Sequence, residues 1–191
     1  MQLCCVLCCY NYAVGMSSPI LYEPRARWGH GAVEVKGRVY IWGGEDSDGN
    51  PYPASLVEVF NIRTGHWEQQ NARGVGPIGV IYSAYTTIGE KLYTFSGRGK
   101  GRTYYNTLHQ LNLKTMKWKK LTSRNPSDAP TPRRGCTMIS YGNDKLVTFG
   151  GYDANNKYSN TLHLFNLRAG ELTFFSASLI YANYVSQALV A

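Results

Sequence analysis

The residues best suited to chemistry in this 191-residue chain are four histidines and five cysteines, and neither set forms a recognised catalytic pattern. The histidines lie far apart, and no Ser-His-Asp order, zinc signature or nucleotide fingerprint accompanies them. His109 and His163 occupy the same position in two copies of a repeated phrase, which is typical of a structural role. We therefore expect a non-enzymatic protein with no cofactor and no metal site.

Four of the cysteines crowd into the first nine residues, at positions 4, 5, 8 and 9. They could bind a metal or carry palmitate, but no second pair of ligands follows them. Residues 1–23 also lack the basic start of a secretory signal, so we interpret them as a Cys-rich apolar leader outside the fold. Only Cys136 lies further along the chain, which argues against a disulfide framework and favours a reducing compartment, the cytoplasm or the nucleus.

A glycine-rich basic loop at residues 97–103 could bind an anion. It resembles a phosphate loop but lacks the Gly-x-x-x-x-Gly-Lys-Ser/Thr spacing, and the pattern predicts no helix after it. With Tyr104 and Tyr105 beside it, the loop also resembles a short RNA-binding segment. The net charge of +8 and the strongly basic residues 79–121 keep nucleic acid or an acidic surface as an alternative partner. We favour a flexible cationic loop that faces a protein ligand.

The chain is organised by an apolar run that ends in small residues and occurs three times. The copies lie at residues 39–44, 92–97 and 146–151, in steps of 53 and 54 residues. Strand-forming residues followed by glycine predict a buried strand that ends at a sharp turn or a close backbone approach. A period near 50 residues indicates a repeat architecture.

Three further strands accompany each copy of the run. One precedes it, at residues 29–35, 80–85 and 135–140, and another follows it, at residues 56–62, 108–113 and 162–167. A fourth strand contains Trp67, Trp118 or Leu172 in the successive copies. Four short antiparallel strands per repeat predict a propeller blade. We therefore expect an all-β fold, a partial propeller of three blades at residues 24–70, 79–121 and 133–175, with an uncharged tail at residues 176–191.

These repeats resemble the kelch family of β-propellers. The first copy carries the whole kelch pattern, with an Arg-x-Gly-His run at residues 27–30, then Gly43, Gly44 and Trp67. The second copy departs from it with Tyr82 in the His position and Ser96 for the first Gly, and the third with Cys136 and Leu172. The residues that we assign to the repeat framework are Gly29, His30, Gly43, Gly44, Trp67, Gly97, Trp118, Gly150 and Gly151. The first blades also resemble the amino-terminal blades of kelch-domain substrate receptors of cullin-RING ubiquitin ligases.

The kelch resemblance implies binding of a peptide segment by loops that gather on one propeller face. The residues that we expect to contact a partner are Arg98, Lys100, Arg102, Tyr104, Tyr105, Arg124, Arg134 and Tyr152. Their guanidinium groups match acidic side chains or a carboxylate, and the tyrosines offer aromatic contact. The expected function is a protein–protein interaction module, with a substrate adaptor for ubiquitination as its narrower form. A metal-dependent oxidase of kelch-like fold, using Cys136 and tyrosines, is the remaining alternative.

Three blades are too few for a closed ring, because propellers close with about four to eight blades. We therefore expect the chain to self-associate or to need additional blades. Residues 172–191 carry no charge and are just long enough for a membrane span, but Asn183 and Gln187 dilute them, so no span is expected. Trp67 and Trp118 are both expected to pack inside their blades.

Overall fold

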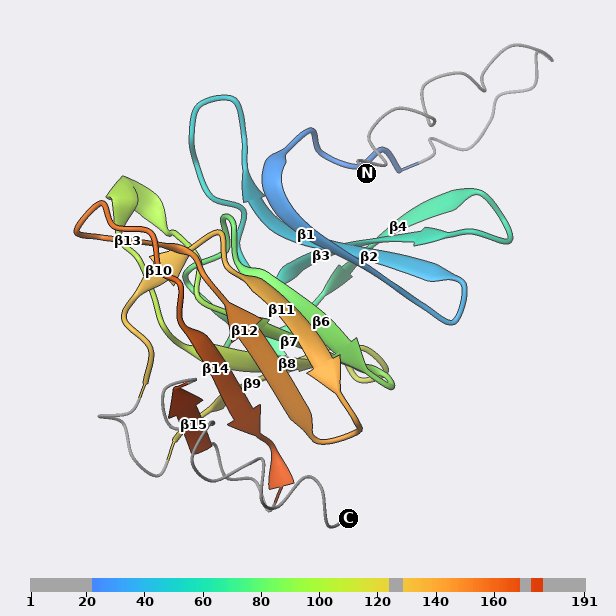
Figure 1. Ribbon diagram of the computed structural model, residues 1–191. Coiled ribbons are helices and arrows are strands. Elements are labelled where there is room, and N and C mark those ends of the chain that lie inside the picture. Colours follow the sequence, from blue (N-terminus) through green and yellow to red (C-terminus); the bar gives the residue numbers. More distant parts are fainter. Residues whose placement is uncertain (1–21, 124–128, 169–172, 177–191) are drawn as a thin grey trace, which may run out of the picture.

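The computed structural model describes residues 22–123, 129–168 and 173–176, and these form three antiparallel sheets that pack face to face (Figure 1). Blade 1 consists of β1 (Trp28–Val35), β2 (Arg38–Glu45), β3 (Leu56–Asn61) and β4 (His66–Asn71). Blade 2 consists of β6 (Ala84–Ile88), β7 (Lys91–Phe95), β8 (Leu108–Asn112) and β9 (Lys117–Leu121). Blade 3 consists of β11 (Thr137–Tyr141), β12 (Lys145–Phe149), β14 (Leu162–Asn166) and β15 (Thr173–Ser176). The all-β, three-blade partial propeller predicted from the sequence is confirmed.

Three short elements depart from four strands per blade. β5 (Arg73–Gly74) adds a fifth strand to the second sheet by pairing in parallel with β9. β10 (Arg133–Arg134) and β13 (Tyr152–Asp153) form a separate two-stranded ladder above blade 3. The helical segment that lies wholly within the described ranges is the 3₁₀ turn η1 (Lys100–Arg102), and no helix there could cross a membrane.

The predicted first strand of blade 2 was placed too early. Residues 80–83 lie outside β6 and connect blade 2 to its neighbours, with Tyr82 N–H donating to the Gly29 carbonyl at 2.8 Å and Gly135 N–H donating to the Tyr82 carbonyl at 2.8 Å. Gly29, Tyr82 and Gly135 share a left-handed backbone, with φ of 65°, 53° and 66°. Tyr82 therefore takes the position of Gly29, and the expectation that it fills the His position is wrong. That position belongs to Ser83.

The core lies between blades and not inside any one of them. We call the side of a blade that faces the preceding blade its N-side face, and the opposite side its C-side face. Between blades 1 and 2, Trp42 of the C-side face meets Trp118 of the N-side face, with ring centroids 5.7 Å apart. Between blades 2 and 3, Phe95 meets Phe165 in the same way at 5.0 Å. These four rings are at most 2% exposed, so blade stacking supplies most of the apolar burial.

The two tryptophans of the fourth strands differ in burial, contrary to the expectation that both are packed. Trp118 is 2% exposed and donates its Nε1–H to the Ala54 carbonyl of blade 1 at 2.8 Å. Trp67 is half-buried and packs mainly on Phe60 of its own blade, with centroids 5.0 Å apart. The reason is that blade 1 covers the N-side face of blade 2, whereas no described blade precedes blade 1. Leu172, the third residue of this series, lies outside the described residues.

Candidate partner-binding site

Arg134 forms the centre of a cluster of aromatic side chains contributed by blades 2 and 3. Its guanidinium carbon lies 5.3 Å from the ring centroid of Tyr82, 5.4 Å from that of Tyr152 and 6.0 Å from that of Tyr104. Its Nε also donates a long hydrogen bond to the Tyr104 hydroxyl at 3.4 Å. The ring faces attract the guanidinium electrostatically, and its remaining N–H groups can donate to a ligand. We call these four residues the Arg134 platform.

The preceding residue explains why Arg134 is held in place. Arg133 is 5% exposed, and its Nη1 donates to the Gly150 carbonyl at 2.9 Å and to the Ser159 hydroxyl at 2.9 Å. Burial lowers the pKa of Arg133, but its carbonyl and hydroxyl partners satisfy the guanidinium. Because successive side chains of a strand point to opposite faces, anchoring Arg133 inside β10 presents Arg134 on the other side. Its backbone partner in β13 is Tyr152, which completes the arrangement.

A pocket of about 600 Å³ opens beside the platform. Its lining combines the Arg134 side chain with glycine backbone and aromatic side chains, namely Gly135, Thr137, Phe149, Gly150, Gly151, Tyr152, Tyr158 and Ser159. Phe149 is 52% exposed and Tyr158 is 87% exposed, which is unusual for side chains of this size. The platform therefore offers one cation beside aromatic rings, a combination suited to a peptide that carries a carboxylate. Phe149, on the other side of the pocket, lies on the open C-side face of blade 3.

The structure brings only part of the expected contact set together. Tyr104, Arg134 and Tyr152 meet at the platform, as just described. Arg98 lies elsewhere in a different role, because it forms an ion pair with Glu45 of blade 1, whose side chain is 3% exposed. A buried carboxylate needs such a partner, so Arg98 joins blade 2 to blade 1.

The other expected contacts also divide. Tyr105 is half-buried, and its N–H donates to the Gly97 carbonyl at 3.0 Å while its own carbonyl accepts from Arg133 N–H at 3.1 Å, so its backbone ties two blades together. Lys100 and Arg102 are exposed on η1. Arg124 lies outside the described residues. In the basic loop at residues 97–103, Arg98 therefore has a structural role, whereas Lys100 and Arg102 are exposed.

Sequence reasoning missed three aromatic residues of this surface. Tyr82 was placed in the His position of the second repeat and not among the contact residues, although its ring lies against Arg134. Trp28 is 54% exposed and meets Tyr82 edge to face at 5.5 Å, and Tyr158 meets Tyr152 at 5.0 Å. The signal that could have found Trp28 is its register: Trp28 and Arg134 are separated by two repeat lengths and precede the same left-handed position. Aromatic and cationic side chains at that register point to one shared surface.

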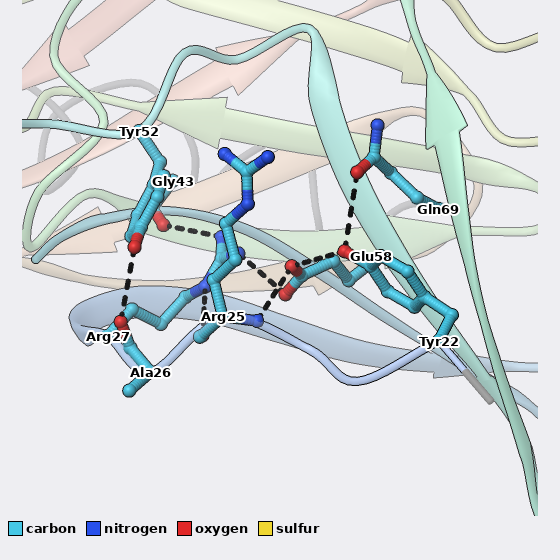
Figure 2. Close-up of polar contacts among 8 residues, drawn as sticks. All are labelled: Tyr22, Arg25, Ala26, Arg27, Gly43, Tyr52, Glu58 and Gln69. Carbon is cyan, nitrogen blue, oxygen red and sulfur yellow. Dashed lines mark hydrogen bonds and ion pairs between the residues drawn. The ribbon is translucent and has the colours of Figure 1, made fainter. Parts of the chain in front are cut away.

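A second polar cluster lies on the N-side face of blade 1 (Figure 2). Arg27 and Glu58 form an ion pair at 2.5 Å with side chains 3% and 1% exposed, and Arg27 Nη1 also donates to the Gly43 carbonyl at 3.0 Å. Glu58 further accepts bonds from the Tyr22 hydroxyl at 2.8 Å and the Arg25 N–H at 3.0 Å. Burial and the hydrogen bond to Glu58 raise the pKa of Tyr22 to about 12. Every strong contact is internal, so we interpret this cluster as structural.

The residues considered for metal or redox chemistry are dispersed. Within the described ranges, no three His, Cys, Asp or Glu side chains lie close enough together to hold a metal ion. Cys136 is buried with its Sγ 3.0 Å from the Ser96 hydroxyl, and burial raises the pKa of the thiol. His109 and His163 are buried on the N-side faces of blades 2 and 3, and burial lowers the pKa of each to about 4. Their repeated place identifies them as neutral core residues.

Sheets of four antiparallel strands that stack face to face around a common centre define the β-propeller class, and comparison with known proteins specifies the kind. The chain belongs to the KLHDC2/KLHL20/DRC7 Kelch-repeats domain family, whose model matches residues 16–179. The solved structure of YjhT superposes with a TM-score of 0.64 at 15% identity, covering 78% of this chain and 51% of that chain. At that identity the likeness shows the fold alone.

Curated relatives carry the same repeats within longer proteins. Human host cell factor 1 is 32% identical over 171 residues, which cover 84% of this chain and 8% of that protein. Human host cell factor 2 is 32% identical over 157 residues, covering 77% of this chain and 19% of that protein. The Arabidopsis thaliana acyl-CoA-binding domain-containing protein 4 is 28% identical over 128 residues. The chain therefore spans less than a fifth of each host cell factor, and these kelch relatives support a protein-interaction module.

Proposed function

We propose that this chain binds an acidic peptide segment of a partner protein at the Arg134 platform. The observation that supports the proposal most is the lack of an ionic partner at the platform. No described residue forms an ion pair with Arg134, and three tyrosine rings surround its guanidinium. Aromatic residues and arginine are the side chains that most often dominate binding energy at protein interfaces. The buried thiol of Cys136 suits a reducing compartment, so we propose that binding takes place in the cytoplasm or the nucleus.

The two arginines of β10 make the proposal specific. Arg133 donates hydrogen bonds within the protein, to the Gly150 carbonyl and to the Ser159 and Thr131 hydroxyls. Arg134 donates one long hydrogen bond, from its Nε to the Tyr104 hydroxyl. A carboxylate could therefore form the parallel pair of N–H···O bonds that guanidinium groups favour, with the tyrosine rings shielding the pair from water.

The experiment is a selection of displayed random dodecapeptides on the purified chain, followed by affinity measurements on synthetic copies of the enriched peptides. We expect enrichment of Asp and Glu, and loss of binding by at least about tenfold for Arg134→Gln, equivalent to about 1.4 kcal/mol. Arg134→Lys keeps the charge but not the planar fork, so its loss should be intermediate.

The matched control is Arg63→Gln, because Arg63 is exposed in the turn between β3 and β4. Its affinity for the same peptides should equal that of the unchanged chain. Peptides without acidic enrichment, or equal binding by Arg134→Gln, would contradict the proposal.

The narrower form of the proposal is that the module selects substrates for ubiquitination. It rests on the resemblance to the kelch substrate receptors of cullin-RING ligases. Affinity capture from cells that express a full-length form, followed by mass spectrometry, tests it separately. Recovery of a cullin would support this form, and its absence alongside other captured partners would remove it while leaving peptide binding intact.

A second candidate is binding of nucleic acid along the outer edge of blade 2. Lys117, Lys119 and Lys120 of β9 and the neighbouring Arg73 of β5 are all exposed, and none has an ion pair within the described part of the chain. Charged side chains at the sheet edge, which β5 and the part of β9 beyond β5 form, also prevent unwanted sheet pairing, so these residues have a structural explanation as well. Measurable RNA affinity with a steep dependence on salt would favour this candidate. Affinity unchanged in a variant with all three lysines replaced by Gln would exclude it.

A further inference from the structure

Neighbouring blades are joined by a pair of backbone hydrogen bonds that repeats from step to step. One bond runs from Tyr82 N–H to the Gly29 carbonyl in the first step, and from Gly135 N–H to the Tyr82 carbonyl in the second. The other bond runs from Gly44 N–H to the Val80 carbonyl at 2.8 Å, and from Gly97 N–H to the Arg133 carbonyl at 2.9 Å. The structure therefore contains one blade-to-blade interface, used twice.

The groups that would extend this ladder are present at both ends of the chain's three blades. On blade 3 they are the Gly135 carbonyl and the Gly151 N–H, which correspond to the Tyr82 carbonyl and the Gly97 N–H. On blade 1 they are the Gly29 N–H and the Arg27 carbonyl. No blade among the described residues lies beyond either end, so these groups lack the inter-blade partner that their counterparts have. The donor and acceptor at one end match the acceptor and donor at the other.

The side chains of the C-side faces show the same contrast. Trp42 of blade 1 and Phe95 of blade 2 occupy equivalent positions and are both fully buried. Phe149, the next residue of this series, is 52% exposed on blade 3. Ile139 and Tyr141 of β11 project from the same side and are 61% and 62% exposed. Exposed apolar residues gathered on one sheet face mark an interaction surface.

The N-side faces repeat the contrast in the opposite direction. Leu113 of blade 2 is 5% exposed in the core between blades 1 and 2. Ile62, its equivalent in blade 1, is 53% exposed. Trp67 and Phe60 of this face are both half-buried, whereas their equivalents Trp118 and Leu111 are buried by blade 1. Both outward faces are thus apolar in the positions that the internal interfaces bury.

We propose that blade 3 of one copy of this chain docks on blade 1 of a second copy, in the geometry of the internal blade steps. Two copies then contain six blades, which lies within the range of about four to eight at which propellers close. The matched region, 78% of this chain, covers 51% of the YjhT chain, so two copies of that region would supply about the length of the YjhT fold. A twofold axis makes both new interfaces identical, so the ring closes without leaving a free face.

The experiment measures the mass of the purified 191-residue chain by light scattering after size exclusion, over a hundredfold range of concentration. We expect twice the mass of one chain at the higher concentrations. Phe149→Lys on the C-side face and Ile62→Lys on the N-side face should each give the mass of one chain, because a buried lysine without a partner opposes association. Both residues are exposed in a single copy, so folding should be retained, and circular dichroism checks this.

The matched control is Val75→Lys, since Val75 is 65% exposed in the linker between blades and lies on neither face. This variant should keep the double mass. A single-chain mass for the unchanged protein at every concentration would overturn the proposal, as would open-ended oligomers. A double mass that survives both Phe149→Lys and Ile62→Lys would overturn it too, because the copies would then meet through another surface.

Discussion

Trp67 and Trp118 occupy equivalent positions on β4 and β9, and their surroundings differ in one respect. Blade 1 covers Trp118 and accepts a hydrogen bond from its indole, whereas Trp67 faces outward on the N-side face of blade 1. The same face nevertheless buries the ion pair between Arg27 and Glu58 almost completely. Blade 1 therefore pairs its buried charged groups without a neighbouring blade, whereas the apolar side chains of its N-side face need a neighbouring blade to become fully buried.

Trp118→Ala is expected to have the largest effect on stability, because blade 1 covers this side chain. Removing a buried large aromatic costs about 3–5 kcal/mol of unfolding free energy, and loss of the bond to the Ala54 carbonyl places this change at the upper end. Chemical denaturation measures it. Trp28→Ala, which removes a tryptophan that is 54% exposed and meets Tyr82 edge to face, is the control and should cost no more than about 1.5 kcal/mol.

Glu58→Gln tests whether the ion pair between Arg27 and Glu58 is buried although no described blade covers this face. The change leaves the Arg27 charge buried without its carboxylate, which we expect to destabilise by about 3 kcal/mol. Glu68→Gln is the matched control, because Glu68 pairs with Arg38 at 2.8 Å but both side chains are more than 40% exposed. That change should lie below about 1 kcal/mol. Equal losses for the two glutamates would mean that the Arg27 pair is solvated.

Trp67→Ala measures how much the uncovered N-side face of blade 1 contributes to stability. In a Phe149→Lys background, where association is expected to be blocked, the half-buried ring should contribute only about 1–2 kcal/mol through its packing on Phe60. A loss as large as that of Trp118→Ala would show that something within the single chain covers this face.

The smallest expected effect is the pH dependence from His109, which fills the position of Glu58 in blade 2. Burial, followed by the nearby Lys120 charge, lowers its pKa from 6.5 to about 4. Between these two values the unfolded chain binds more protons than the folded chain, so stability falls as the pH drops through this window. We expect a loss of about 1 kcal/mol between about pH 7.5 and 5.5, which His109→Gln should reduce. His66→Gln, at the exposed first residue of β4, should leave the dependence unchanged.

The sequence was sufficient to predict the fold but only part of the candidate site. The repeated run ending at Gly43, Ser96 and Gly150 set the blades, because left-handed backbone with φ of 66°, 63° and 74° recurs there. The register of Tyr82 could not be predicted, since a tyrosine in a left-handed position gives no local signal. Residue type also could not tell the anchored Arg98 from the presented Arg134. That difference depends on contacts between residues more than 20 positions apart.

The most direct test of the account is hydrogen exchange at the Gly151 amide, with the Gly97 amide as the internal reference. Gly97 N–H donates across the interface between blades 2 and 3, and Gly151 N–H is its counterpart at the open end of blade 3. We expect both amides to exchange slowly in the unchanged chain, and Phe149→Lys to accelerate exchange at Gly151 but not at Gly97. Rapid exchange at Gly151 in the unchanged chain at high concentration would contradict the claim that the open faces are blade interfaces.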